Sequence, residues 1–260
     1  MLGWSINLFK VFGIQLAVHA SFLLLLAYYG YEGWIDGGMP GLLWSVGLIV
    51  LFFVCVILHE LGHSLTARRY GVRTSRILLL PIGGMAELEQ IPRKPSAELL
   101  ITVAGPAVNF AIFGTLAVVF GLPQGLPFHP EFEDSYRGFG QLLLYSNLIM
   151  GTFNLVPVFP MDGGRILRAL LAIRMPYLTA TYWAVMVGRV LSVLLAVGAV
   201  YKGNYMLGVL FMFIFFAGAA EYRQTLRREQ EDAYWAEMAR RARMVAPVGE
   251  EPPLLIHGPN

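Results

Sequence analysis

Long apolar stretches alternate with short polar ones along the chain. Six of these stretches approach or exceed the roughly 20 residues that an α-helix needs to cross a bilayer, and the first is short for that role. They cover residues 16–31, 42–67, 97–121, 140–158, 182–201 and 205–220. The pattern therefore predicts a mainly α-helical integral membrane protein with about six spans.

The fourth stretch is interrupted by Pro157 and Pro160. A proline inside a helix removes a backbone hydrogen bond and breaks or kinks the helix. Irregular backbone at membrane depth is tolerated only where protein or a water-filled cavity satisfies its polar groups. We therefore expect this broken span to line a functional site.

The segment 77–86 is apolar but too short to cross a membrane. It contains Pro81 and the neighbouring pair Gly83 and Gly84, which favour a tight turn between two strands. We expect a short β-hairpin between the second and third spans that dips back into the membrane.

Composition agrees with a membrane protein. The 260 residues are 57% hydrophobic and 14% charged, whereas soluble domains carry about 25% charged residues. No basic run with interleaved aromatic residues is present, so we expect membrane lipid and no nucleic acid among the partners. The one cysteine, Cys55, lies among apolar neighbours and is expected to be a buried, inert thiol.

Basic residues predict the orientation. Most lysines and arginines follow the second, fourth and sixth spans, whereas the opposite loops carry Arg137, Lys202 and several acidic residues. By the positive-inside rule both termini are cytoplasmic. We divide the chain into a membrane core at 1–220, a charged cytoplasmic helix at 221–245 and a disordered tail at 246–260 that is rich in proline.

Residues 59–63, inside the second span, have the sequence His-Glu-Leu-Gly-His. His59 and His63 stand at positions i and i+4, which share one face of a helix, so both imidazoles can reach one zinc ion. Glu60 lies beside the first ligand, where a carboxylate can take a proton from water at the metal. The alternative is a polar helix face that packs against other spans, but ionisable residues inside a membrane usually mark function.

Catalytic zinc sites have a third protein ligand, and Asp162 at the end of the broken span is our candidate. His59 precedes Arg68 by about 13 Å of helix, and Asp162 precedes Arg168 by about 9 Å, at 1.5 Å per residue. Both groups therefore fall in the cytoplasmic half of the membrane. The alternative role for Asp162 is a helix cap ahead of Gly163.

Three motifs occur in order: His-Glu-x-x-His at 59–63, Gly-Pro-x-x-Asn at 105–109, and Asn-x-x-Pro-x-x-Pro-x-Asp-Gly at 154–163. With them the sequence resembles, over residues 13–172, the site-2 protease family of intramembrane zinc metalloproteases. The resemblance implies one zinc ion per chain, held by His59, His63 and Asp162. It also implies that Glu60 is the catalytic carboxylate.

The same resemblance implies that Asn154 steadies the substrate or its oxyanion. It implies that Gly83 and Gly84 belong to a membrane-dipping strand that pairs with an unwound substrate, typically a membrane-tethered protein with a single span. Family branches with a CBS or PDZ domain exist, and we expect a minimal core enzyme without either. The substrate and the oligomeric state stay open.

Two other functions remain as alternatives: a zinc-binding membrane protein without proteolysis, and a metal transporter. The presence of both Glu60 and Asp162 favours the protease, and the compact ligand set is unlike the dispersed ligands of transporters. We expect Gly105, Pro106 and Asn109 to serve close helix packing, with Asn109 hydrogen-bonding across helices. For Arg189 the sequence leaves two roles open: snorkelling to the interface or meeting a buried acid.

Overall fold

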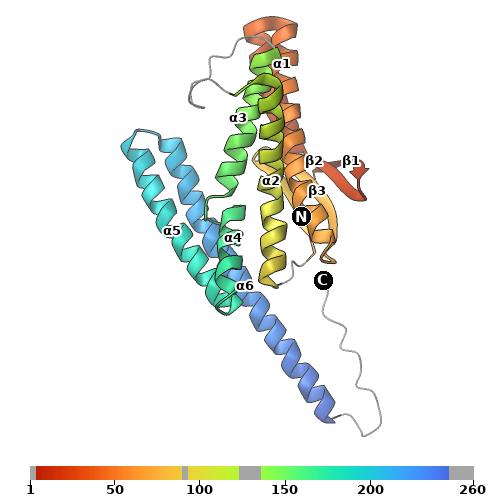
Figure 1. Cartoon of the computed structure of the whole chain (residues 1–260), viewed down its shortest axis with the longest axis vertical. Helices are drawn as coiled ribbons and strands as arrows, with labels where there is room; N and C mark the ends of the chain where they lie inside the picture. The colour runs from red at the N-terminus through yellow and green to blue at the C-terminus, as the bar shows by residue number, and fades with distance from the viewer. Residues whose placement is uncertain (1–3, 90–92, 123–135, 246–260) are drawn as a thin grey trace. The chain divides into compact units, whose positions relative to one another are not determined.

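The structure, a computed structural model, describes residues 4–89, 93–122 and 136–245, so the predicted tail at 246–260 lies outside the described residues. One compact unit contains strands β1 (Ser5–Val11), β2 (Ile14–His19), β3 (Thr74–Leu80) and β4 (Gly83–Leu88), with helices α1 (Ala20–Arg68), α2 (Pro95–Phe120), α3 (Tyr136–Asn154) and α4 (Asp162–Ala172). A second unit contains α5 (Tyr177–Tyr201) and α6 (Tyr205–Val245). Figure 1 labels these elements except β4.

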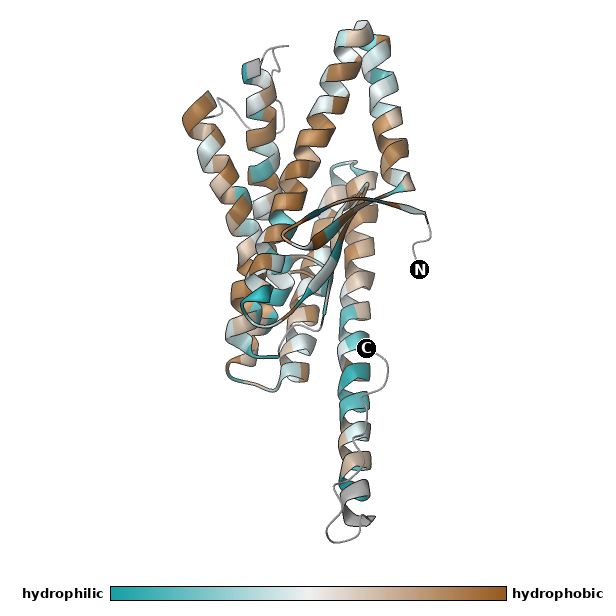
Figure 2. Cartoon of the chain, turned by 90° about the vertical axis from the view of Figure 1, so that its right-hand side faces the viewer, coloured by the Kyte–Doolittle hydropathy of each residue, from teal (hydrophilic) through white to brown (hydrophobic). Residues whose placement is uncertain are grey.

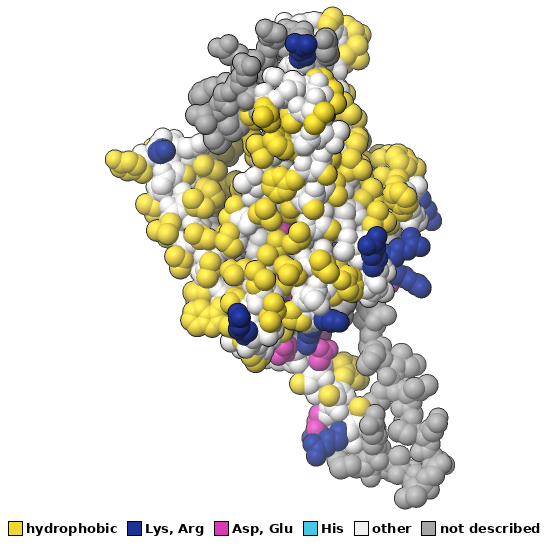
Figure 3. Space-filling view, viewed as in Figure 1, with side chains coloured by type: hydrophobic (Ala, Val, Ile, Leu, Met, Phe, Trp, Pro, Cys, Tyr) yellow, Lys and Arg dark blue, Asp and Glu magenta, His cyan; other side chains and the backbone are white. Residues whose placement is uncertain are grey.

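The described chain is mainly helical, as predicted, and four of its helices are long and apolar enough to cross a membrane: α1, α2, α5 and α6. Hydropathy along α6 falls from hydrophobic to hydrophilic in Figure 2, where the charged segment begins. Hydrophobic side chains cover much of the helical surface visible in Figure 3. Exposed apolar side chains of this extent are expected where lipid is the solvent.

Helix α1 consists of two arms, residues 20–36 and 39–68, joined at Gly37 and Gly38, whose backbone angles are not helical. Gly38 has φ +61° and ψ −143°, a conformation that favours glycine. Gly33 and Gly41 let the arms meet closely, since a side-chain carbon on either would overlap the backbone of the other. Figure 2 shows the two arms meeting at this turn and diverging below it. The predicted first and second spans correspond to these arms.

The predicted start of the first span is wrong. Leu16 lies in β2, and the helix begins only at Ala20, where His19 accepts a hydrogen bond from the Ser21 N–H at 3.2 Å and caps the helix. Strand β2 is largely buried on both faces. A strand of that kind is a continuous apolar run, which hydropathy alone cannot separate from the start of a span.

The strands form one sheet in the order β1-β2-β3-β4, with β2 and β3 parallel and the outer pairs antiparallel. The predicted hairpin at 77–86 is present as β3 and β4, joined by a tight turn at Leu80 and Gly83. Alternate residues of β2 and β3 pack against α1 in an apolar core: Ile14, Leu16, Val18, Ile77 and Leu79 with Phe22, Phe53, Val56 and Leu61. This core holds the sheet against both arms of α1.

In the second unit, the guanidinium carbon of Arg189 lies 4.5 Å from the centre of the Phe215 ring, between α5 and α6. This cation–π contact differs from both roles that the sequence left open for Arg189. Cys55 is free and buried, as expected.

Candidate metal centre

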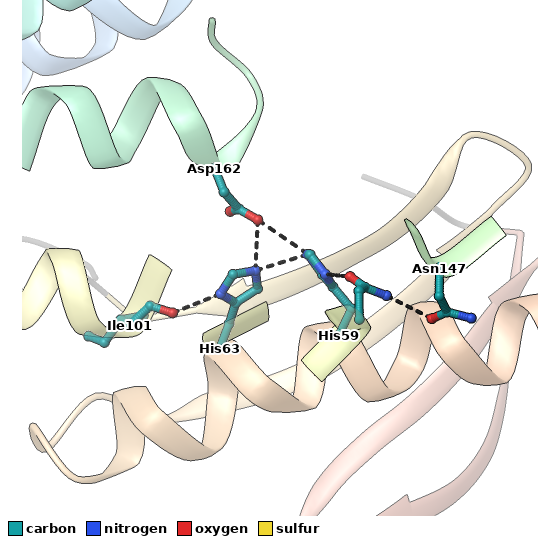
Figure 4. A network of polar contacts seen from close by, with 6 residues as sticks. His59, His63, Ile101, Asn147 and Asp162 are labelled. Atoms are coloured by element: carbon teal, nitrogen blue, oxygen red, sulfur yellow. Dashed lines mark hydrogen bonds and ion pairs between the residues drawn. The ribbon is translucent and has the colours of Figure 1, made fainter. Parts of the chain in front are cut away.

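The side chains of His59 and His63 in α1 and of Asp162 in α4 converge within the first unit. The Nε2 atoms of His59 and His63 lie 3.1 Å apart. The Asp162 Oδ2 atom lies 3.3 Å from His59 Nε2 and 3.2 Å from His63 Nε2, and Figure 4 shows these contacts. Ligands at about 2.0–2.1 Å from a tetrahedral zinc ion are about 3.3 Å from each other. The triangle therefore has the dimensions of three ligands of one zinc ion.

Asp162 is the first residue of α4, and Met161 is the residue at the helix cap, so the capping alternative for Asp162 is not what the structure has. The adjacent Gly163 packs against the backbone that leaves α3. A side-chain carbon there would overlap the carbonyl oxygens of Leu155 and Val156. Glycine at this position therefore lets α4 begin beside the end of α3 and aims Asp162 at the two histidines.

A chain of buried amides determines which nitrogen of His59 carries the proton. The Asn147 amide donates to the Leu143 carbonyl at 2.8 Å, so its oxygen accepts from the Asn109 amide at 3.0 Å. The Asn109 oxygen is then the acceptor for His59 Nδ1–H at 2.5 Å. A neutral imidazole that donates from Nδ1 presents a lone pair at Nε2.

His63 is oriented by α2. Its Nδ1–H donates to the Ile101 carbonyl at 2.8 Å, which leaves the Nε2 lone pair directed at Asp162. Two lone pairs and a carboxylate oxygen thus face each other, and Asp162 Oδ2 is buried without a hydrogen-bond partner. The facing lone pairs and the carboxylate oxygen repel each other. Burying an unsatisfied charge is also costly. A cation among the three atoms removes that repulsion, and two imidazoles with one carboxylate suit zinc.

Gly105 of α2 supplies the space for an ion. A side-chain carbon on this residue would overlap Nε2 and Cε1 of His63 and come within 2.8 Å of His59 Nε2. The backbone of α2 therefore forms one wall of the metal cradle, which is the space between Gly105 and the ligand atoms of His59, His63 and Asp162. The side chain of any larger residue at position 105 would occupy this cradle.

The other candidate residues lie around this centre. Glu60 follows His59 on α1, is half-buried and packs against β4, since a side-chain carbon on Gly84 would be 2.7 Å from Glu60 Cγ. Gly83 has φ +138°, which favours glycine, and open space around it. Asn154 is half-buried and is the last residue of α3, and a loop connects it to Asp162 at the start of α4. Neither Gly83 nor Asn154 is part of the converging set.

The sequence matches the family described as peptidase family M50 over residues 47–137 and 132–195, which is more than half of the chain and includes all three converging residues. The chain belongs to peptidase family M50. The resemblance to site-2 proteases is thereby confirmed. With four helices long and apolar enough to span a bilayer, this M50 chain is an integral membrane protein.

Among relatives of this M50 chain is a zinc metalloprotease of Methanocaldococcus jannaschii, 38% identical over 224 residues that cover 85% of the chain and 62% of that protein. A Synechocystis protein named as a zinc metalloprotease is 35% identical and matches over 64% of the chain and 44% of its own length. The chain thus spans less than two thirds of these relatives. The solved site-2 protease from Methanocaldococcus jannaschii matches with a TM-score of 0.58 and 37% identity, over 84% of the chain and 95% of that structure.

Sequence reasoning missed part of this M50 site. It assigned Gly105 and Asn109 to helix packing and did not single out Asn147. Asn109 does bond across helices, but its partner is a metal-site histidine. One signal was available: Gly105 and Asn109 are four residues apart, the same i, i+4 spacing as His59 and His63, so each pair shares one face of its helix.

We predict that Asn109→Ala weakens zinc binding about 10–100-fold, the usual effect of removing a group that orients a metal ligand. Without Asn109, His59 is free to rotate or to carry its proton on Nε2. A chelator competition gives the zinc dissociation constant. Thr115→Ala is the matched control, because the Thr115 hydroxyl bonds only the Ala111 carbonyl of the same helix in the hydrogen bonds described. Equal zinc affinity of Asn109→Ala and Thr115→Ala would contradict the role of Asn109.

Proposed function

We propose that the chain is an intramembrane zinc metalloprotease that hydrolyses peptide bonds within or near the membrane-spanning segments of membrane-tethered proteins. The observation that carries the proposal is the triangle of the buried His59 and His63 with the half-buried Asp162, whose ligand atoms lie 3.1–3.3 Å apart. Membership of family M50 and the zinc metalloproteases among its relatives support it.

In this proposal His59, His63 and Asp162 hold one zinc ion. Bound zinc supplies Lewis-acid chemistry, since it polarises a peptide carbonyl and makes water acidic enough to lose a proton near neutral pH. The Glu60 carboxylate accepts a proton from the water whose oxygen bonds to the scissile carbonyl carbon. It then returns that proton to the amine that leaves as the C–N bond breaks, so it acts as a general base and then as a general acid. Asn154 donates a hydrogen bond to the oxyanion that develops on the substrate carbonyl.

We also propose six membrane crossings: the two arms of α1, then α2, α3, α5 and α6. The break at Gly37 and Gly38 divides α1 into two arms, and the 19 residues of α3 extend about 28 Å at 1.5 Å per residue. The distribution of basic residues favours cytoplasmic termini, a metal site in the cytoplasmic half of the bilayer and a cytoplasmic end of α6 at 221–245.

The proposed substrate is a single-span membrane protein that unwinds and adds to the sheet as an extended strand. Strand β4 supports this, because it is at the edge of the described sheet and Gly84 lies against the side chain of Glu60. An edge strand offers unpaired backbone groups to which an extended peptide can bind. Such pairing would bring the substrate backbone next to the carboxylate that moves the proton.

We predict that Gly84→Val lowers cleavage on the order of a hundredfold, the usual consequence of a misplacement of about 1 Å, while zinc content stays unchanged. The added side chain would meet Glu60 and Val56 and push the edge of β4 away from the site. Cleavage rate and zinc content are measured on the same preparation. Gly47→Val is the control, because Gly47, like Gly84, has no positive φ, but it has open space around it and lies in α1, outside the sheet. Unchanged cleavage by Gly84→Val would exclude the strand-pairing role.

The deciding experiment measures zinc content and cleavage of a single-span test substrate by the purified chain in lipid nanodiscs. We expect about one zinc per chain, loss of cleavage when a chelator strips the metal, and recovery when zinc returns. A chain that holds zinc without cutting any of a panel of spans is a zinc-binding protein. Zinc transport into sealed vesicles would instead identify a transporter. If the chain binds no zinc, the assignment of His59, His63 and Asp162 as zinc ligands is wrong.

A further inference from the structure

A buried ion pair joins α2 to α4 next to the metal ligands. The Arg168 guanidinium donates from Nε at 2.8 Å and from Nη2 at 2.5 Å to Glu98 Oε1. Glu98 is 0% exposed and Arg168 is 5% exposed. Removing two such charges from a polar solvent is costly, and apolar residues of similar volume often stabilise a fold equally well. The pair therefore needs a reason other than stability.

Each partner lies on a helix that holds one side of the metal site. Glu98 is one turn before Ile101, whose carbonyl orients His63, and two turns before Gly105, which forms the wall of the cradle. Arg168 lies six residues after Asp162 on α4, about 9 Å along the axis. The ion pair thus connects the helix that orients a histidine ligand to the short helix that carries the aspartate.

Apolar contacts alone fix the position of α4 poorly. Packing between apolar side chains is not directional, and in a membrane lipid tails compete for the same surface. A guanidinium that donates two hydrogen bonds to one carboxylate has a single good geometry, and fixing a register is the best-attested use of buried polar pairs. Sliding or rotating α4 by a fraction of a turn would break the pair and move Asp162 away from the histidines.

We propose that the Glu98–Arg168 ion pair positions Asp162 for metal binding by fixing the register of α4 against α2. The proposal rests on the proposed zinc site. Neither residue belongs to the converging set of His59, His63 and Asp162, so the pair acts through Asp162 and is a positioning pair. Its loss is expected to loosen zinc without removing any ligand.

The test compares zinc affinity with thermal stability in four variants of the full chain in nanodiscs. Glu98→Gln leaves a buried guanidinium without its carboxylate, and should lower both. Arg168→Lys keeps the charge but loses the planar fork, and should weaken zinc binding by about tenfold. The deciding variant combines Glu98→Met with Arg168→Met, which removes both charges and keeps apolar volume. Phe22→Leu is the control for a stability loss in the apolar core, which contains none of the three ligands.

If the pair sets the register, the double variant regains the stability that Glu98→Gln loses but binds zinc about 10–100-fold more weakly than the unmodified chain. The absorption spectrum of bound cobalt(II) should also differ from that of the unmodified chain, because the ligand geometry has changed. Two results would overturn the inference: a double variant with unmodified zinc affinity and cobalt spectrum, or an equal loosening of zinc in Phe22→Leu. The unmodified chain, measured alongside, tests the proposed function separately, and if it binds no zinc both proposals fail.

Discussion

Glu60→Gln is expected to lower substrate cleavage on the order of 10²–10⁴-fold, the usual contribution of a general base, with zinc affinity unchanged. Glutamine has nearly the same shape as glutamate, so the packing between this side chain and β4 at Gly84 is kept. Its amide cannot accept and return a proton at neutral pH. The value of kcat/KM on a single-span substrate and the zinc content of the same preparation give the two quantities.

Glu32→Gln is the matched control for this prediction. It makes the same change on the same helix at an exposed position in the other arm of α1, so cleavage should equal that of the unmodified chain. A Glu60→Gln variant that cuts within tenfold of the control would show that another group moves the proton. A variant that loses its zinc would show that Glu60 supports the metal.

The sequence predicted the converging residues because their chemistry follows local rules. His59 and His63 share a helix face by their spacing, and the prolines at 157 and 160 mark the broken span that leads to Asp162. The depth estimate from basic residues predicted that both ligand groups lie in the cytoplasmic half of the membrane. The β3–β4 hairpin was predicted for a similar reason, since its turn carries proline and glycine at a short apolar run.

The parts that the sequence did not predict depend on which helices are neighbours. The hydrogen bond from Asn109 to Asn147 joins residues 38 positions apart, and the bond from Arg168 to Glu98 joins residues 70 positions apart. Nothing in the local sequence around any of these four residues indicates its distant partner. The sequence assigned Gly105 to helix packing. Its role becomes visible only where α2 lies beside α1, because Gly105 leaves space for the two imidazoles. Strand β2 was missed because a buried apolar strand and the start of a span have the same hydropathy. Strand β1, which is mostly exposed and lies before the first predicted span, was not predicted either.

Gly105→Ala is expected to weaken zinc binding on the order of a thousandfold. The added methyl group would lie far inside the ordinary contact distance of about 3.5–4.0 Å from His63, so the imidazole must rotate away and lose its bond to the Ile101 carbonyl. Zinc binding to small protein sites is worth about 10–16 kcal/mol. Losing one of three ligands would remove about 4 kcal/mol of it, and 1.4 kcal/mol is about tenfold.

Gly114→Ala makes the same change on the same helix at a position with open space, so both variants gain the same helix propensity and differ only at the cradle. Zinc affinity from chelator competition, with thermal stability measured alongside, separates a lost ligand from a lost fold. If Gly105→Ala binds zinc as tightly as Gly114→Ala, α2 does not form the wall of the metal cradle. If only Gly105→Ala loses zinc while both variants remain folded, zinc binding depends on Gly105, a residue that the sequence analysis assigned to packing.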